Sequence, residues 1–288
     1  MKFFTILRNA ARCAGAASVA SRPRRLLARV LPAIFVLASC TAPVQRFGSG
    51  RLNASEKMMW STYPMGSEKG MGTGFVVLRR DRSAPGGSVP VVVTAGHLLD
   101  AIGRRPFFIG ARMPDAKGDA QVALIEFKPP RDNARFFSRD ARHDIGVFEL
   151  RIPPEFASQV SMPSFLSDAM RTGRRLRAGE EVSFVGFPEV LPEMEGAFPI
   201  LRTGRVASYP VGVAAAEGVF VINADVYPGD SGAPVFVTGR AGRPELAGMI
   251  IRRVGSDQKA FSHLAIAVDA RAVYEAVNSL AAKSGRGE

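Results

Sequence analysis

Three short segments contain residue types that could together activate a hydroxyl group. Ser231 lies in the sequence Gly-Asp-Ser-Gly-Ala-Pro at 229–234, where flanking glycines let the backbone turn. A serine hydroxyl is a weak nucleophile at neutral pH, so it needs a neighbouring base and hydrogen-bond donors for the oxyanion that forms. The predicted donors are the amides of Gly229 and Ser231. A plain Gly-rich turn is the alternative interpretation, since Gly, Asp and Ser are common turn residues.

His97 and Asp144 could supply and orient the base. His97 directly follows the apolar segment 89–94, and Asp144 directly precedes the apolar segment 145–150. A carboxylate can hold an imidazole in one tautomer and stabilise its protonated form. Taken singly, a core histidine and a turn aspartate would explain both residues, so the hypothesis depends on all three segments. His143 is expected to point to the opposite face of the strand, with a surface role.

Short apolar segments rich in Val, Ile and Phe must position these residues. They alternate with Gly and Pro without a helical pattern between them, which is typical of an all-β sandwich or barrel. One amphipathic helix is predicted over 269–283, with Asp269 as its N-cap. The ten segments predicted as strands are 74–78, 89–94, 122–127, 145–150, 182–187, 204–208, 219–224, 233–237, 246–251 and 264–268.

These motifs resemble those of the trypsin-like serine proteases, in particular the disulfide-free bacterial branch with the glutamyl endopeptidases and the high-temperature-requirement proteases. The base and the acid precede the serine, whereas α/β-hydrolases and subtilisins have other orders. The resemblance implies an all-β, chymotrypsin-like fold of two packed six-stranded antiparallel β-barrels, to which the sequence adds a C-terminal α-helix. The matching motifs are Thr-Ala-Gly-His at 94–97, His-Asp-Ile-Gly-Val at 143–147, Pro-Gly-Asp-Ser-Gly-Ala-Pro at 228–234, Gly-Thr-Gly-Phe-Val-Val at 72–77 and Leu-Ala-Ile-Ala-Val at 264–268.

The same resemblance implies a serine endopeptidase that cleaves protein or peptide substrates through an acyl-enzyme. His97 would be the base, Asp144 would orient it and Ser231 would be the nucleophile. Two alternatives stay open: a catalytically silent binding or regulatory lipoprotein with this fold, and an esterase-type acyl hydrolase. No metal and no cofactor is predicted, because the sequence has no His-Glu-x-x-His, paired-cysteine or Gly-rich lysine motif. In trypsin, activation pairs the aspartate before the serine with a freed amino terminus. That is not implied here, because a lipidated Cys40 has no free amine, and the partner of Asp230 is left open.

Substrate preference is ambiguous in the sequence. Asp225 stands six positions before Ser231, where the family has the floor of its specificity pocket, and a carboxylate there would accept Lys or Arg. The strand that follows the nucleophile is expected to form the pocket wall and to pair with the substrate backbone. Its residues Ile251, Arg252 and Arg253 are the other predicted substrate-binding residues. The two arginines would favour acidic side chains instead, or would only be a solvated strand edge.

The first 40 residues are predicted to direct export. They contain seven of the 38 Lys and Arg residues, no Asp or Glu, and a short apolar run that ends in Leu-Ala-Ser-Cys. This pattern predicts a signal peptide over 1–39, a lipidated Cys40 as in bacterial lipoproteins, and a flexible tether over 40–56. The protein is therefore expected in the cell envelope or periplasm, held to a membrane through Cys40.

Charge and cysteine content limit the partners and the covalent cross-links that the domain after residue 40 can have. After the first 40 residues, 31 basic residues face 26 acidic ones, so a nucleic-acid partner is not predicted. The chain has two cysteines, Cys13 and Cys40, which leaves no internal disulfide for the mature domain. We expect one protease domain over 57–283, with an N-terminal barrel over about 57–165, a C-terminal barrel over about 166–268 and a closing helix over 269–283. The oligomeric state is not predicted.

Overall fold

The computed structural model describes the folded domain and not the predicted leader. The predicted signal peptide, Cys40 and the tether up to residue 52 lie outside the described residues. No helix in the described part of the chain is long and apolar enough to cross a membrane. The described residues are 53–67, 70–82, 84, 87–103, 105–114, 120–128, 137–150, 165–166, 176–189, 198–209, 211, 218–239, 244–254 and 263–284.

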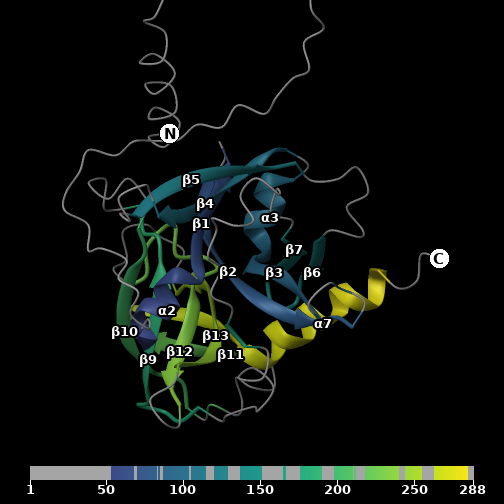
Figure 1. Ribbon diagram of the computed structural model, residues 1–288. Coiled ribbons are helices and arrows are strands. Elements are labelled where there is room, and N and C mark those ends of the chain that lie inside the picture. Colours follow the sequence, from purple (N-terminus) through teal and green to yellow (C-terminus); the bar gives the residue numbers. More distant parts are fainter. Residues whose placement is uncertain are drawn as a thin grey trace, which may run out of the picture.

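The N-terminal half is a curved sheet that forms a half-barrel (Figure 1). Among the described residues, its strands pair in the order β5-β4-β1-β2-β3-β7-β6. Each neighbouring pair in this order is antiparallel. A short eighth strand, β8, pairs with β2 in parallel. The strands are β1 (Thr62–Ser67), β2 (Gly70–Arg80), β3 (Ser88–Ala95), β4 (Phe107–Pro114), β5 (Ala120–Phe127), β6 (Phe137–Asp140), β7 (Ile145–Glu149) and β8 (Phe165–Leu166).

The C-terminal half is a closed barrel of six antiparallel strands, in the order β10-β11-β14-β13-β12-β9. Closure pairs every strand on both sides, so this barrel has no free edge. The strands are β9 (Glu181–Gly186), β10 (Ile200–Val206), β11 (Val219–Asn223), β12 (Pro234–Thr238), β13 (Pro244–Arg253) and β14 (Leu264–Asp269).

Alternation along the strands divides the buried apolar side chains among three clusters. Val76 and Val92 face a cluster inside the N-terminal half-barrel, and Phe184 and Ile222 face a cluster inside the C-terminal barrel. Side chains on the opposite face of the strands form the third cluster, which lies between the two halves. It contains Phe75 and Val93 from one half and Val185, Phe236 and Met249 from the other. The two halves therefore share an apolar interface, which fixes one relative to the other.

Three described helices complete the fold. α2 (Ala54–Trp60) begins inside the predicted tether, because Asn53 and Glu56 cap its first turn through reciprocal bonds between side chain and backbone. α3 (Gly96–Ile102) follows β3 directly. α7 (Ala270–Ser284) lies across both halves and adds Val273, Val277 and Leu280 to the cluster between them (Figure 1).

The predicted fold class is confirmed, and each of the ten predicted strands overlaps an observed one. Sequence patterns missed β1, β4, β6 and β8. β1 and β4 each contain a glycine and a proline, which interrupt the alternation that marks a strand. β6 and β8 are only four and two residues long. The helices α2 and α3 were missed as well, since seven residues are too few to show a period of 3.6.

Asp269 caps α7 and supplies a test of this part of the fold. Its Oδ1 accepts a bond from the backbone N of Arg271 at 2.7 Å, while burial raises the pKa of the Asp269 carboxyl above its ordinary value. We expect Asp269→Ala to lower the free energy of unfolding by about 1 kcal/mol, as loss of an N-cap does, in urea titrations. Asp269→Asn keeps an acceptor without a buried charge and should cost less than half as much.

The raised pKa also sets the sign of a pH effect. The folded state binds the proton of Asp269 more tightly than the unfolded state, so wild-type stability should fall as pH rises through this titration, from about pH 4 upward. Asp269→Asn should remove that part of the pH dependence. An equal loss in both variants would show that the cap bond does not stabilise α7.

Candidate active site

The ends of β3 and β7 bring His97 and Asp144 together. Strand register pairs Ala95 with Ile145, so the residues just after β3 and just before β7 are neighbours. Oδ1 of Asp144 accepts a bond from the backbone N of His97 at 2.7 Å, and Oδ2 lies 2.6 Å from His97 Nδ1. The backbone N of Gly96 donates to the Asp144 carbonyl at 2.7 Å. The imidazole is thus held through both its ring and its main chain.

This pair has the arrangement that a general base requires. A carboxylate on Nδ1 keeps the proton on that nitrogen and leaves Nε2 as the basic atom. The side chain of His97 is 49% exposed and that of Asp144 is 26% exposed, so the ring can meet a ligand while the carboxylate is partly covered.

Thr73 joins the serine segment to the strand ends of the N-terminal half. Its backbone N donates to the Ser231 carbonyl at 2.8 Å, and its hydroxyl donates to the Gly229 carbonyl at 2.7 Å. The same hydroxyl accepts a bond from the backbone N of Phe187 at 3.2 Å, and the hydroxyl of Thr94 donates to the Thr73 carbonyl at 2.7 Å. Thr73 is fully buried. Ser231 is therefore anchored to β2 and β3, the second of which leads directly to His97.

The glycines around Ser231 are required by the backbone. Gly229 has φ 97° and Gly232 has φ 92°, in the left-handed region that favours glycine. A Cβ on Gly232 would lie 1.9 Å from the Thr73 carbonyl oxygen, so no other residue fits there without a shift. The interpretation of this segment as a plain surface turn does not explain so close a fit against β2.

The two amides predicted to bind an oxyanion differ from the neighbouring amides in their hydrogen bonds. The backbone N of Asp230 donates to Tyr227 and that of Gly232 donates to Ile250. By contrast, the backbone amides of Gly229 and Ser231 donate to none of the residues that the structure describes.

Arg202 on β10 is the partner of Asp230. Nη1 of Arg202 donates to Oδ2 of Asp230 at 2.8 Å, and Nη2 donates to Oδ1. The Asp230 side chain is fully buried and that of Arg202 is 17% exposed. The guanidinium also lies 4.6 Å from the centroid of the Phe184 ring. This ion pair fixes the residue that precedes Ser231, and nothing in the local sequence motifs identified it.

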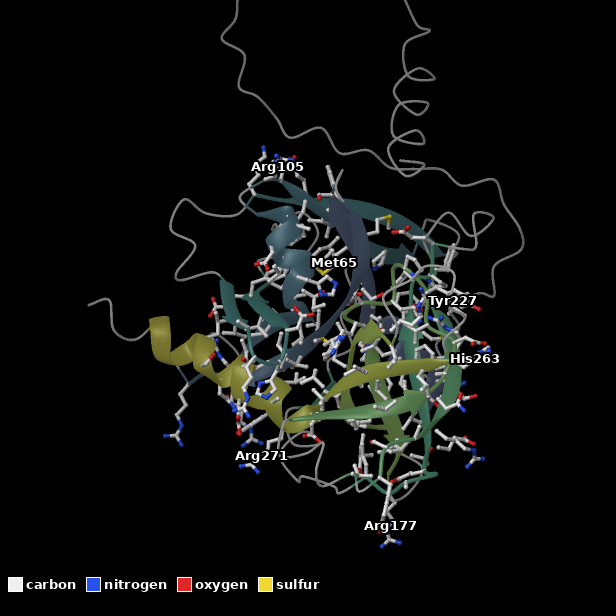
Figure 2. All side chains as sticks on the ribbon, turned by 180° about the vertical axis from the view of Figure 1, so that it is seen from behind. Met65, Arg105, Arg177, Tyr227, His263 and Arg271 are labelled. Carbon is white, nitrogen blue, oxygen red and sulfur yellow. The ribbon has the colours of Figure 1, made fainter. Side chains whose placement is uncertain are left out.

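Asp225 is engaged by a histidine. Its Oδ1 lies 2.5 Å from Nδ1 of His263, with side chains that are 56% and 69% exposed. Its backbone oxygen accepts a bond from Arg202 Nη1 at 3.3 Å. Figure 2 shows His263 and Tyr227 on the same side of the C-terminal barrel. Asp225 is therefore close to the Asp230 pair, and its carboxylate already has a hydrogen-bond partner in His263.

The three predicted substrate-binding residues on β13 differ in exposure. Ile251 is 6% exposed and packs in the cluster between the two halves, so its side chain is not open to a substrate. Arg252 is exposed and Arg253 is half-buried. β12 pairs with β13 only as far as Met249, so Arg252 and Arg253 pair with β14 alone and the interpretation of these arginines as a solvated strand edge stays open.

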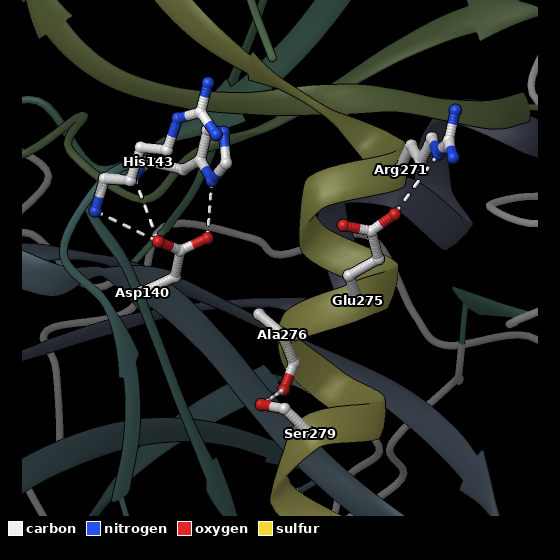
Figure 3. A network of polar contacts seen from close by, with 7 residues as sticks. Asp140, His143, Arg271, Glu275, Ala276 and Ser279 are labelled. Carbon is white, nitrogen blue, oxygen red and sulfur yellow. Dashed lines mark hydrogen bonds and ion pairs between the residues drawn. The ribbon is translucent and has the colours of Figure 1, made fainter. Parts of the chain in front are cut away.

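His143 also differs from its predicted surface role. It lies in a turn over 141–144 rather than in a strand, and its side chain is only 14% exposed. Its Nδ1 lies 2.5 Å from Oδ2 of Asp140 (Figure 3). The expectation failed because strand alternation does not apply within a turn.

Comparison with known protein families gives one match. The model of a family described as trypsin-like peptidase domain matches residues 72–243. Protease Anisep from Arthrobacter nicotinovorans is similar over 78% of this chain and 96% of its own, with a TM-score of 0.50 and 15% identity, which shows a shared fold. An inactive mutant form of Rv3671c from M. tuberculosis H37Rv matches over 87% and 98%, with a TM-score of 0.47 and 18% identity. No curated protein sequence matches this chain significantly.

Loss of Arg202 should unfold or strongly destabilise the domain. Arg202→Met leaves the buried Asp230 carboxylate without its counter-ion, which typically costs about 3–5 kcal/mol. Arg205→Met on the same strand is the matched control, because Arg205 is 65% exposed and its ion pair with Glu181 is 3.7 Å long. An exposed pair contributes about 0–1 kcal/mol. Urea titrations should separate the two variants, and equal losses would contradict a special role for the Arg202 pair.

Proposed function

Because this chain belongs to the trypsin-like peptidase domain family, we propose that it is a serine endopeptidase with Ser231 as nucleophile, His97 as general base and Asp144 as the residue that orients the base. The observation that carries the proposal is the position of a half-exposed imidazole, which Asp144 holds through hydrogen bonds at Nδ1 and at the backbone N. His97 directly follows β3, and Thr94 and Thr73 tie this strand to the Ser231 segment. A catalytic base needs a fixed tautomer and a fixed ring, and it also needs access to the nucleophile and the substrate.

The first step is attack of the Ser231 hydroxyl on the carbonyl carbon of the scissile peptide. His97 Nε2 accepts the hydroxyl proton, and the imidazolium that forms is stabilised by Asp144. The carbonyl oxygen becomes negative and accepts bonds from the amides of Gly229 and Ser231. The buried Arg202–Asp230 pair and Thr73 support these amides, because they hold the backbone on both sides of the nucleophile.

The second step breaks the peptide bond. The imidazolium returns its proton to the amine of the leaving peptide, which departs and leaves the acyl-enzyme on Ser231. A water molecule then attacks the acyl carbon with His97 again as base, and the product acid is released. No metal is needed in these steps, and the part of the chain that the structure describes has no cluster of three potential metal ligands.

A fluorophosphonate probe tests this function directly. Wild-type protein should be labelled, and Ser231→Ala should not, since the probe reacts with an activated serine hydroxyl. Ser279→Ala, on α7, is the matched control and should be labelled like wild type. On a protein substrate such as casein, Ser231→Ala and His97→Ala should each lower kcat by about a millionfold, as for residues that act as a unit.

The outcome also separates the alternative functions. A folded wild-type protein that is not labelled would contradict the proposal and favour a silent binding or regulatory protein. Labelling with hydrolysis of activated esters but of no peptide or protein would favour an esterase.

Substrate preference is proposed to depend on the Asp225–His263 pair. A Lys or Arg side chain would have to compete with His263 for the Asp225 carboxylate, and Arg252 and Arg253 add positive charge on the pocket strand. We therefore expect no strong preference for basic residues before the cleaved bond. The exposed pair is worth about 1 kcal/mol at most, so His263→Ala should raise kcat/KM for an Arg substrate over an Ala substrate by about fivefold.

The double variant supplies the control for this prediction. Without the carboxylate, His263→Ala/Asp225→Ser should return to the wild-type ratio of Arg to Ala substrates. The ratios are measured with fluorogenic peptides that differ only at the residue before the cleaved bond. A wild-type enzyme that strongly prefers Arg and is unaffected by His263→Ala would show that His263 does not limit Asp225.

The place of action is proposed from the sequence alone. An exported protein tied to a membrane by a lipid on Cys40 would act on proteins in the cell envelope or periplasm. The absence of internal cysteine pairs in the mature domain is compatible with this, because three buried clusters stabilise the fold.

A further inference from the structure

The turn between β6 and β7 holds a second Asp–His pair beside the first. Oδ1 of Asp140 accepts bonds from the backbone N of Arg142 at 3.0 Å and of His143 at 3.3 Å, and Oδ2 lies 2.5 Å from His143 Nδ1 (Figure 3). Asp140 also pairs with Ile145 across the two strands. One carboxylate thus closes the whole turn, up to the residue before Asp144.

The ring of His143 reaches the other half of the molecule. A Cβ on Gly218, the residue before β11, would lie 2.7 Å from His143 Nε2, so the ring packs directly against this glycine. The Gly218 carbonyl in turn accepts a bond from the backbone N of Asp269, at the start of α7. His143 therefore fits between the turn that carries Asp144 and the C-terminal barrel.

Asp144 needs such support because of its backbone. Its φ is 55°, and it is the only non-glycine residue with positive φ among the described residues. This conformation is unfavourable for a residue with a Cβ, though Asp tolerates it better than most, and it persists where surrounding contacts hold it. On one side Asp144 is held by Gly96 and His97, and on the other by the turn that ends at His143.

We propose that His143, clamped between Asp140 and Gly218, is a positioning residue that sets the left-handed backbone of Asp144 and through it the orientation of His97. The inference rests on the proposed roles of Asp144 and His97. His143 touches neither the base nor the substrate. It acts through the peptide bond to Asp144, by fixing the backbone position from which the Asp144 side chain extends.

The charge on Asp140 makes this clamp persistent at neutral pH. Burial raises the pKa of the Asp140 carboxyl, but its hydrogen bond with His143, the charge of His143 and the two backbone amides together hold that pKa below its ordinary value. Charge-assisted bonds of this kind are stronger than neutral ones. By contrast, the Asp225–His263 pair has similar geometry but is mostly exposed and holds no strained residue.

Labelling kinetics with the fluorophosphonate test the proposal in the full-length protein. His143→Ala removes the ring and the bond to Asp140, so Asp144 and His97 should lose their fixed geometry. We expect the labelling rate and kcat to fall about 10- to 100-fold, the scale of a misplaced catalytic group, with KM within twofold and with the final extent of labelling complete. His143→Asn should recover most of the rate, because its Nδ2 can donate to Asp140 from the position of the histidine Nδ1.

Two further measurements separate positioning from simple stability. Glu275→Gln on α7, which disrupts an exposed ion pair with Arg271 near the same turn, should leave the labelling rate unchanged (Figure 3). In proton NMR spectra, the His97 Nδ1 proton bonded to Asp144 should shift or vanish in His143→Ala and return in His143→Asn.

The possible results are distinct. If His143→Ala is labelled at the wild-type rate, or if it only lowers the final extent while the remaining sites react at that rate, the positioning role is wrong and the residue is merely structural. If wild-type protein itself is not labelled, the proposed function fails and this inference fails with it. If wild-type protein is labelled and His143→Ala is labelled at the same rate, the inference on His143 is overturned while the proposed function stands.

Discussion

The hydrogen bonds of Thr73 are the constraint on which the arrangement of the site depends. One buried residue of the N-terminal sheet uses its amide, its carbonyl and both capacities of its hydroxyl, and three of the four bonds lead to the C-terminal half. A buried polar group without a partner costs about 1–3 kcal/mol, so a sliding motion that broke these bonds would be opposed several times over. The apolar cluster between the halves is not directional, and it could not fix Ser231 relative to His97 without them.

The chain has three histidines, and each is bonded through Nδ1 to an aspartate at 2.5–2.6 Å. The local geometry of the three pairs is nearly the same, so it cannot by itself assign their roles. Surroundings make the difference. His97 is half exposed beside the anchored serine segment, His143 is packed between two halves of the fold, and His263 is open to solvent.

Sequence patterns predicted those parts of the molecule that depend on neighbours in the chain. The strands with regular alternation, the cap of α7 and the glycines around Ser231 were all visible as local patterns. Partners distant in sequence were not. Arg202 and Asp230 meet because β9 pairs with both β10 and β12, and no spacing rule links positions 28 apart. Thr73 was part of a recognised motif, but its four bonds depend on sheet register. His143 was misplaced because its segment was taken as a strand.

The Arg202–Asp230 pair links the loop before Ser231 to completion of the fold. Arg202 belongs to β10, the strand whose pairing with β9 and β11 closes the C-terminal barrel. A chain with β10 unpaired would leave the Asp230 carboxylate without its counter-ion, so loop order and barrel closure should be gained and lost in one cooperative transition. Ordering of this loop thus depends on a side chain of the same barrel. A partly folded molecule with β10 unpaired would therefore have neither a closed barrel nor an ordered segment around Ser231.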